Sequence, residues 1–162
     1  MATVFIGLGT NLGARARNLA EARRLLAPAV RLKVESTVIE TEPWGHADQP
    51  DFLNQVVQAE TDLAPVALLQ ALKSIETRLG REPSFRYGPR RIDLDILYYD
   101  DLVRVAPELT IPHPNLHLRD FVLLPLVEIA PNWVHPVLKR TNLELWEDLN
   151  EPGKPDNGSL LP

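Results

Sequence analysis

One segment near the middle of the chain, residues 88–97, reads Gly-Pro-Arg-Arg-Ile-Asp-Leu-Asp-Ile-Leu and constrains the fold and the chemistry together. Its turn and two arginines lead into a strand that carries Asp93 and Asp95. Side chains two positions apart on a strand point to the same face, so both carboxylates share a face while the apolar residues between them face a core. Two carboxylates beside arginines offer hard oxygen ligands to Mg²⁺ next to cations that bind phosphate. The segment predicts an enzyme that acts on a nucleotide.

The charge of the surrounding sequence supports this interpretation. Five arginines lie between Arg78 and Arg91, in a chain whose net charge is −5. The plain alternatives are a solvated basic loop and two surface aspartates on a solvated strand. The acidic balance also argues against a broad nucleic-acid surface.

Length and composition predict one domain over residues 1–162, with 151–162 as a flexible tail rich in Pro, Gly and Asn. Hydrophobic residues make up 44% of the chain, enough for a core. The absence of cysteine excludes disulfides, zinc–thiolate sites and thiol nucleophiles. The start lacks a signal-peptide pattern, and no apolar run approaches the roughly 20 residues of a membrane span. We expect a cytoplasmic protein that does not contact a membrane.

The periodicity of apolar residues predicts an α+β fold. Strands are expected over residues 3–9, 31–40, 52–61 and 91–99, and helices over 15–27, 65–79, 118–129 and 142–149. The first six of these elements follow the order β-α-β-β-α-β, which predicts a ferredoxin-like fold with a four-stranded antiparallel sheet and both helices on one face. The other face would be open to chemistry, and a Pro-rich stretch at 107–114 would precede the C-terminal helices.

Several further residues have suitable chemistry. Arginines are preferred phosphate ligands, because their planar fork matches phosphate oxygens. His113 lies between two prolines that stiffen its backbone, so it could donate to a phosphate, although it could equally be an ordinary loop histidine. Glu76 precedes the Arg-rich loop and could meet a ribose or a cation. The candidate phosphate ligands are Arg81, Arg86, Arg90 and Arg119.

A set of aromatic and polar residues could form a slot for a flat heterocycle, with the Asn54 amide reading a ring edge. The alternative is that the aromatic members belong to the core. The set is Thr41, Trp44, Phe52, Asn54, Tyr87 and Phe121.

Two nucleotide-binding motifs are excluded. Residues 7–13, Gly-Leu-Gly-Thr-Asn-Leu-Gly, resemble a dinucleotide fingerprint, but the third glycine comes one place late and the β-α-β-β order gives no parallel βαβ unit. The sequence also contains no P-loop.

Taken together, residues 1–135 resemble the 6-hydroxymethyl-7,8-dihydropterin pyrophosphokinases of folate biosynthesis. The order of the motifs is more specific than any one of them. They are Gly-Leu-Gly-Thr-Asn-Leu-Gly at 7–13, Asp-Gln-Pro-Asp-Phe-Leu-Asn at 48–54, Gly-Pro-Arg-Arg-Ile-Asp-Leu-Asp at 88–95, Ile-Pro-His-Pro at 111–114, Arg-Asp-Phe at 119–121 and Pro-Leu-Val-Glu-Ile-Ala-Pro at 125–131.

The resemblance implies transfer of the β,γ-diphosphate of ATP to the pterin hydroxymethyl group, with release of AMP. We expect the protein to be a monomer. It implies that Asp93 and Asp95 hold two Mg²⁺ ions, and that Arg81, Arg86 and Arg90 are catalytic. The implied ATP ligands are Lys73, Glu76, Arg81, Arg90, Ile96, Thr110, His113 and Arg119. The implied pterin ligands are Thr41, Pro43, Trp44, Asn54, Tyr87 and Phe121, where Tyr87 replaces a frequent Trp.

Two positions depart from the family pattern. Pro83 stands where some members carry a loop arginine, and Pro114 replaces a tyrosine found in some members.

Two other functions remain open at this stage. An RNA-recognition domain shares the β-α-β-β-α-β order, but the chain lacks its paired strand aromatics and basic face. A regulatory sensor would bind nucleotide or pterin without turnover.

Overall fold

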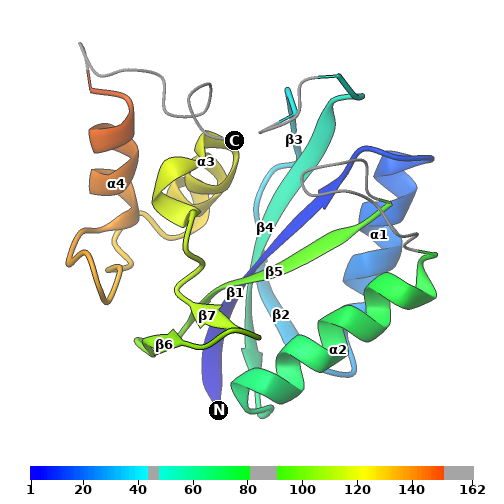
Figure 1. The fold of residues 1–162 in the computed structure, drawn as a ribbon, viewed down its shortest axis with the longest axis horizontal. Helices are drawn as coiled ribbons and strands as arrows, with labels where there is room; N and C mark the ends of the chain where they lie inside the picture. Colours follow the sequence, from blue (N-terminus) through cyan, green and yellow to red (C-terminus); the bar gives the residue numbers. More distant parts are fainter. Residues whose placement is uncertain (44–47, 81–90, 152–162) are drawn as a thin grey trace.

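The computed structural model describes residues 1–43, 48–80 and 91–151 (Figure 1). No helix within these ranges is both long enough and apolar enough to cross a bilayer. The elements in chain order are β1 (Ala2–Thr10), α1 (Arg15–Leu26), β2 (Arg31–Glu35), β3 (Ile39–Thr41), β4 (Phe52–Thr61), α2 (Pro65–Arg78), β5 (Asp93–Tyr99), β6 (Arg104–Val105), β7 (Thr110–Ile111), the 3₁₀ turn η1 (Leu116–Leu118), α3 (Asp120–Ile129) and α4 (Asn142–Leu149).

The main sheet is antiparallel and has the spatial order β2-β4-β1-β5, with β3 also paired to β4. It contains five strands rather than the expected four, because the single strand expected over 31–40 is divided into β2 and β3. Between them, the Ser36 hydroxyl accepts a hydrogen bond of 2.9 Å from the Val56 backbone N–H. This side-chain contact replaces a ladder bond and interrupts the strand.

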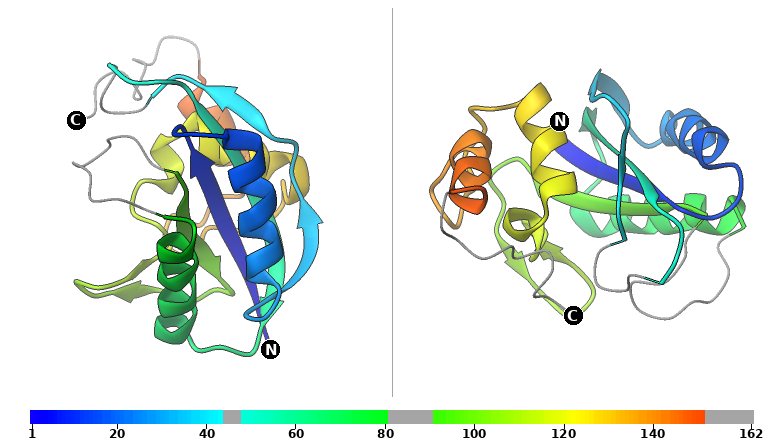
Figure 2. Two further views of the ribbon diagram at one scale, coloured as in Figure 1. Left: turned by 90° about the vertical axis from the view of Figure 1, so that its right-hand side faces the viewer. Right: turned by 90° about the horizontal axis from the view of Figure 1, so that it is seen from above.

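Helices α1 and α2 lie side by side over one face of the sheet, as Figure 2 shows. They begin and end close to the positions that the apolar spacing predicted, with Pro65 in the first turn of α2 and Gly80 just beyond its end at a φ of +80°. Their buried residues pack against alternate residues of the strands, such as Val4, Ile6 and Leu8 of β1. This layer is the larger of the two apolar clusters.

The opposite face of the sheet is divided into two halves. In the half near the start of β1, Phe5, Val56, Leu97 and Tyr98 pack under α3 and α4, which lie across the sheet from α1 and α2 in Figure 1. We call this the apolar half. We call the other half, formed by the far end of the same strands, the polar half; it carries Gly7, Gly9, Asn54, Asp93 and Asp95.

A β-bulge at Leu97 marks the boundary between these halves. In the β1–β5 ladder, Ile6 pairs with Ile96 and Phe5 pairs with Tyr98, so Leu97 has no opposite residue. A bulge resets the alternation of a strand. As a result, Leu97 and Tyr98 both join the cluster under α3 although they are neighbours in the sequence.

The C-terminal part contains a small hairpin that the sequence did not predict. Strand β6 lies just before the Pro-rich stretch expected over 107–114, and β7, with which it pairs, lies within that stretch. The Ile111–Pro112 peptide bond is cis. Helix α4 starts with a capping box, in which Thr141 and Glu144 each accept from the other's backbone N–H.

Candidate active site

The two aspartates of β5 share one face of the sheet, which confirms the expected geometry. Asp93 lies opposite Gly9 and Asp95 opposite Gly7 in the β1–β5 ladder. Both aspartates are partly exposed, whereas Leu94 between them is 4% exposed and belongs to the core under α1 and α2. The neighbouring strand therefore contributes no side chain beside either carboxylate.

Gly9 lies at the centre of the polar half, because it pairs with Asp93 on one side and with Asn54 on the other. A Cβ atom at Gly9 would lie 3.2 Å from Oδ1 of Asn54, closer than an ordinary contact. Glycine thus leaves room between the carboxylates and the amide for another molecule to approach the backbone.

Asn54 and Thr41 form a hydrogen-bonded pair across β3 and β4. Asn54 is 7% exposed, and its Nδ2 donates to Oγ1 of Thr41 over 2.6 Å. Thr41 pairs with Phe52 in the β3–β4 ladder, so Phe52 lies on the same face as Asn54 and is partly buried. Pro43 is partly buried just beyond β3. These residues form part of the expected heterocycle slot.

Two hydrogen bonds, one from its backbone N–H and one to its ring, hold His113 in place. Its N–H donates to the Leu97 carbonyl over 3.0 Å, and its Nδ1 accepts from the Asn115 N–H over 3.1 Å. Burial, and then the positive charge of Arg119, lower the pKa of His113 to about 4. The ring is therefore neutral at pH 7, and because Nδ1 is an acceptor, Nε2 carries the proton and can donate to a ligand.

Two of the other candidates lie at or near the diaspartate strand. Glu76 of α2 is 5% exposed, and its Oε2 accepts from the Leu94 backbone N–H over 2.9 Å. This contact fixes the strand between the two aspartates. The side chain of Ile96 is 4% exposed and lies in the core, so only its backbone is available to a ligand.

The remaining described candidates come from three separate elements. Lys73 is exposed on α2, and Thr110 is partly buried in β7. Arg119 comes directly before α3, with its Cζ 5.6 Å from the ring centre of Phe121. Arg119 and Phe121 thus form a cation–π pair at the start of the helix.

Five predicted site residues lie outside the described residues. They are Trp44, Arg81, Arg86, Tyr87 and Arg90.

Asn11 was missed by the sequence analysis. It is 2% exposed, and its Nδ2 donates to Oε1 of Gln49 over 2.8 Å and to the Pro50 carbonyl over 2.9 Å. It thereby joins the turn after β1 to the connection that precedes β4. The available signal was an asparagine directly after a predicted strand. It lies in the Gly-rich segment 7–13, which had been considered only as a dinucleotide motif.

The donor set suits magnesium better than a transition metal. Within the described ranges, no group of three or more His, Cys, Asp or Glu side chains converges on one point. Asp93 and Asp95 supply two carboxylates beside backbone without side chains. Mg²⁺ usually binds through one or two carboxylates and takes its other ligands from phosphate and water, so these residues fit it.

Comparison with known proteins shows the family of this chain. A profile of the 7,8-dihydro-6-hydroxymethylpterin-pyrophosphokinase family, abbreviated HPPK, matches residues 5–131. The chain is 44% identical over 140 residues to the 2-amino-4-hydroxy-6-hydroxymethyldihydropteridine pyrophosphokinase of Aquifex aeolicus, an alignment that covers 86% of this chain and 88% of that protein. It is 39% identical over 154 residues to the folic acid synthesis protein FOL1 of Dictyostelium discoideum, covering 95% of this chain but only 23% of that longer protein.

A solved structure of Plasmodium falciparum HPPK-DHPS shares the fold. The match has a TM-score of 0.74 at 19% identity and covers 91% of this chain and 44% of that chain. The profile match spans most of the sequence and includes the diaspartate strand, the glycines opposite it and the Asn54 strand. The chain therefore belongs to the 7,8-dihydro-6-hydroxymethylpterin-pyrophosphokinase family.

Proposed function

We propose that this protein transfers the β,γ-diphosphate of ATP to the hydroxymethyl group of 6-hydroxymethyl-7,8-dihydropterin, giving the pterin diphosphate and AMP. The observation that carries the proposal is the polar half of the sheet. There Asp93 and Asp95 face two glycines, and Asn54 lies beyond Gly9 on the next strand. Metal ligands and a polar ring-reading group thus lie on one surface, as transfer between a nucleotide and a heterocycle requires.

Asp93 and Asp95 would hold two Mg²⁺ ions together with the phosphate oxygens of ATP. When bound, the ions supply neutralisation of charge that develops on the transferred group. Glu76 accepts from the backbone between the two aspartates and so fixes their strand. Reactions of this kind depend mainly on positioning and electrostatic stabilisation, and no side chain of the described site needs to act as a general base.

The phosphates would meet cations from two directions. Arg81, Arg86 and Arg90 are proposed as the catalytic arginines, and Arg119 would approach from the start of α3. His113 would donate from Nε2, since its Nδ1 is engaged by the Asn115 N–H. The other residues proposed to contact ATP are Lys73, Glu76, Thr110 and the backbone of Ile96.

The pterin would lie against the Asn54–Thr41 pair. Asn54 donates one amide hydrogen to Thr41, which leaves its second hydrogen and its Oδ1 for the edge of a ring. The proposed slot is completed by Pro43, Trp44, Tyr87 and Phe121, whose rings would pack on the flat faces of the pterin.

The remaining expectations form part of the same proposal. The strand order supports a ferredoxin-like core in which β3 extends the strand after α1. Residues 1–162 would act as one pyrophosphokinase domain, working as a cytoplasmic monomer on small-molecule substrates. The tail expected at 151–162 lies, after Glu151, outside the described residues.

The nucleotide product tests the proposal directly. Incubation with hydroxymethyl-dihydropterin, Mg²⁺ and ATP should give AMP and pterin diphosphate in equal amounts. ADP would indicate transfer of a single phosphoryl group, and binding without turnover would indicate a sensor. Either result would reject the proposed reaction.

A further inference from the structure

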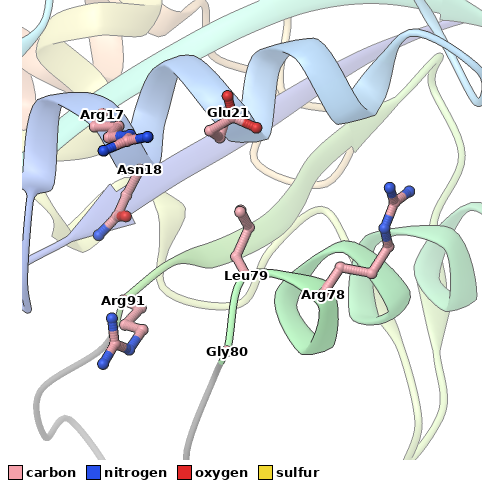
Figure 3. A pocket seen from close by; sticks show the side chains of 7 residues that line it. All are labelled: Arg17, Asn18, Glu21, Arg78, Leu79, Gly80 and Arg91. Atoms are coloured by element: carbon pink, nitrogen blue, oxygen red, sulfur yellow. The ribbon is translucent and has the colours of Figure 1, made fainter.

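A hollow lies between α1 and α2, on the helical side of the sheet and so on the face opposite the candidate active site. It has a volume of about 550 Å³ and is lined by Arg17, Asn18 and Glu21 of α1, by residues 78–80 at the end of α2, and by Arg91. Figure 3 shows Arg17 and Arg91 at one end of the hollow, Arg78 at the other and the Leu79 side chain between them. Asp93 and Asp95 are not part of its lining.

The three arginines of this hollow differ from six other arginines that the structure describes, each of which forms an ion pair. Among the described residues, no carboxylate oxygen lies within 4.0 Å of a guanidinium nitrogen of the three, and Arg17 acts on Glu21 only over a longer distance. The arginines that do form ion pairs are Arg15, Arg23, Arg24, Arg31, Arg104 and Arg140.

The one acidic residue of the lining is already engaged. Glu21 Oε2 accepts from Nη2 of Arg24 over 2.8 Å and from Nε over 3.3 Å, and this contact lowers the pKa of the Glu21 carboxyl. Arg24 lies outside the hollow. The described lining therefore carries three arginines against one carboxylate, and that carboxylate is hydrogen-bonded to an arginine outside the hollow.

The side chain of Arg91 passes close to two turns. A Cβ atom at Gly13 would lie 3.6 Å from Nη1 of Arg91, and one at Gly80 would lie 3.7 Å from Cδ. Both glycines have positive φ, at +75° and +80°. Because the arginine already lies along these backbones, it would lose little conformational freedom when it binds an anion.

Strand alternation does not determine where Arg91 points. Strand β5 begins at Asp93, two residues later. Arg91 can therefore turn to the helical side, although a continuous strand would place it on the face of the two aspartates.

We propose that this hollow binds a small molecule that carries two or more phosphate groups. Guanidinium groups bind phosphate through paired hydrogen bonds, and three of them around one hollow suit a polyanion better than a single charge. The arginines lie at both ends of the hollow, which favours an extended phosphate chain. The volume exceeds the space that one phosphate needs, and the site is separate from the face proposed for the transfer reaction.

Binding can be measured without turnover, so the test is independent of the proposed reaction. Tripolyphosphate, without Mg²⁺, is titrated into the ¹⁵N-labelled full chain and followed by amide chemical shifts. We expect saturable shifts at Asn18, Leu79 and Gly80. The double variant Arg17→Gln/Arg78→Gln should bind at least tenfold more weakly at these amides.

The matched control is Arg31→Gln/Lys33→Gln, which removes the same charge from exposed positions on β2. It should bind as the wild type does. Shifts confined to the amides around Asp95 and His113 would overturn the proposal, as would equal binding by the two double variants. Shifts at the hollow with an acidic peptide but not with tripolyphosphate would also overturn it, and would indicate a protein partner.

Discussion

The two halves of one sheet face show how a single set of strands can serve packing and chemistry. Strands β1, β4 and β5 run through both halves. In the apolar half they present Phe5, Val56 and Tyr98 to α3 and α4. In the polar half the same strands present Gly9, Asn54 and Asp93. The difference arises from side-chain size and polarity, together with the β-bulge at Leu97 that marks the boundary.

The comparison teaches that the site depends on its covered neighbour for rigidity. The aromatic rings of Phe5, Tyr98 and Trp133 pack edge to face or tilted, with centroid separations of 4.9 to 6.2 Å. This packing holds the strands at one end, while the glycines leave space at the other end. Catalytic groups placed on rigid strands keep their geometry better than groups on loops.

The largest expected effect comes from removing a carboxylate of the polar half. Asp93→Ala or Asp95→Ala should lower kcat at least about a thousandfold, because the phosphate-bridging cations lose a ligand. The AMP-release assay measures this, and circular dichroism checks that the fold survives. Asp101→Ala, an exposed aspartate just after β5, is the control and should keep full activity. Unfolding of the two site variants would instead indicate that the aspartates are structural.

A change in the apolar half should affect stability rather than binding. Leu97→Ala removes a side chain that is 2% exposed and should lower the free energy of unfolding by about 2–5 kcal/mol. Urea denaturation gives the value, and the folded enzyme should keep its KM for both substrates. Leu124→Ala on the exposed side of α3 should change stability by less than about 0.5 kcal/mol. Equal losses in both variants would contradict the division of the face.

The glycines of the polar half allow a finer test. Gly9→Ala places a methyl group 3.2 Å from Oδ1 of Asn54, so the amide must shift by a few tenths of an ångström. We expect the KM for the pterin to rise about tenfold, which corresponds to a loss of about 1.4 kcal/mol of binding free energy. For Gly7→Ala the three atoms nearest to the new methyl group all belong to the Leu97 side chain, at 3.5 Å or more, an ordinary contact distance. This variant should change the same KM less than about threefold. If the two variants behave alike, Gly9 does not protect the slot.

The smallest expected effect concerns pH and the buried histidine beside the apolar half. His135 is 5% exposed, its Nδ1 accepts from the N–H groups of Val137 and Leu138, and burial, followed by the charge of His117, lowers its pKa to about 4. Between pH 6.5 and 4 the unfolded chain binds this proton and the folded chain does not, so stability falls as the pH falls.

His135→Asn keeps an acceptor at this position but cannot titrate. Thermal unfolding from pH 7 to 4 should therefore show a smaller slope for the variant, by up to about one proton. Identical slopes for the variant and the wild type would show that His135 does not contribute. His113 carries a shift in the same direction in both proteins and cancels, so the difference reports His135 together with its coupling to His117.

The sequence was sufficient for features that depend on neighbouring residues. The shared face of Asp93 and Asp95 follows from alternation alone, and Pro65 and Gly80 delimit α2 through their backbone preferences. Features that depend on distant partners were missed. The division of β2 from β3 rests on the contact of Ser36 with Val56, and nothing local distinguishes Ser36 from other strand residues.

The site was predicted in the same uneven way. Residue types and alternation were enough to propose Asp93 and Asp95 as metal ligands, while the position of Asn54 next to Gly9 requires the register of β1 and β4. The bulge at Leu97 was not visible, because Ile96, Leu97, Tyr98 and Tyr99 are all apolar or aromatic and both faces are covered there. The roles of Arg81, Arg86 and Arg90 remain predictions from the sequence.

The extra residue in β5 has a consequence for how this protein can vary. Deleting Leu97 would restore simple alternation with Tyr98 still opposite Phe5 and Tyr99 still opposite Val4, so both rings would keep their faces. Only the Leu97 side chain would be lost from the cluster under α3. A one-residue deletion can thus be absorbed at the bulge, whereas in a regularly paired stretch it would move every later side chain to the other face.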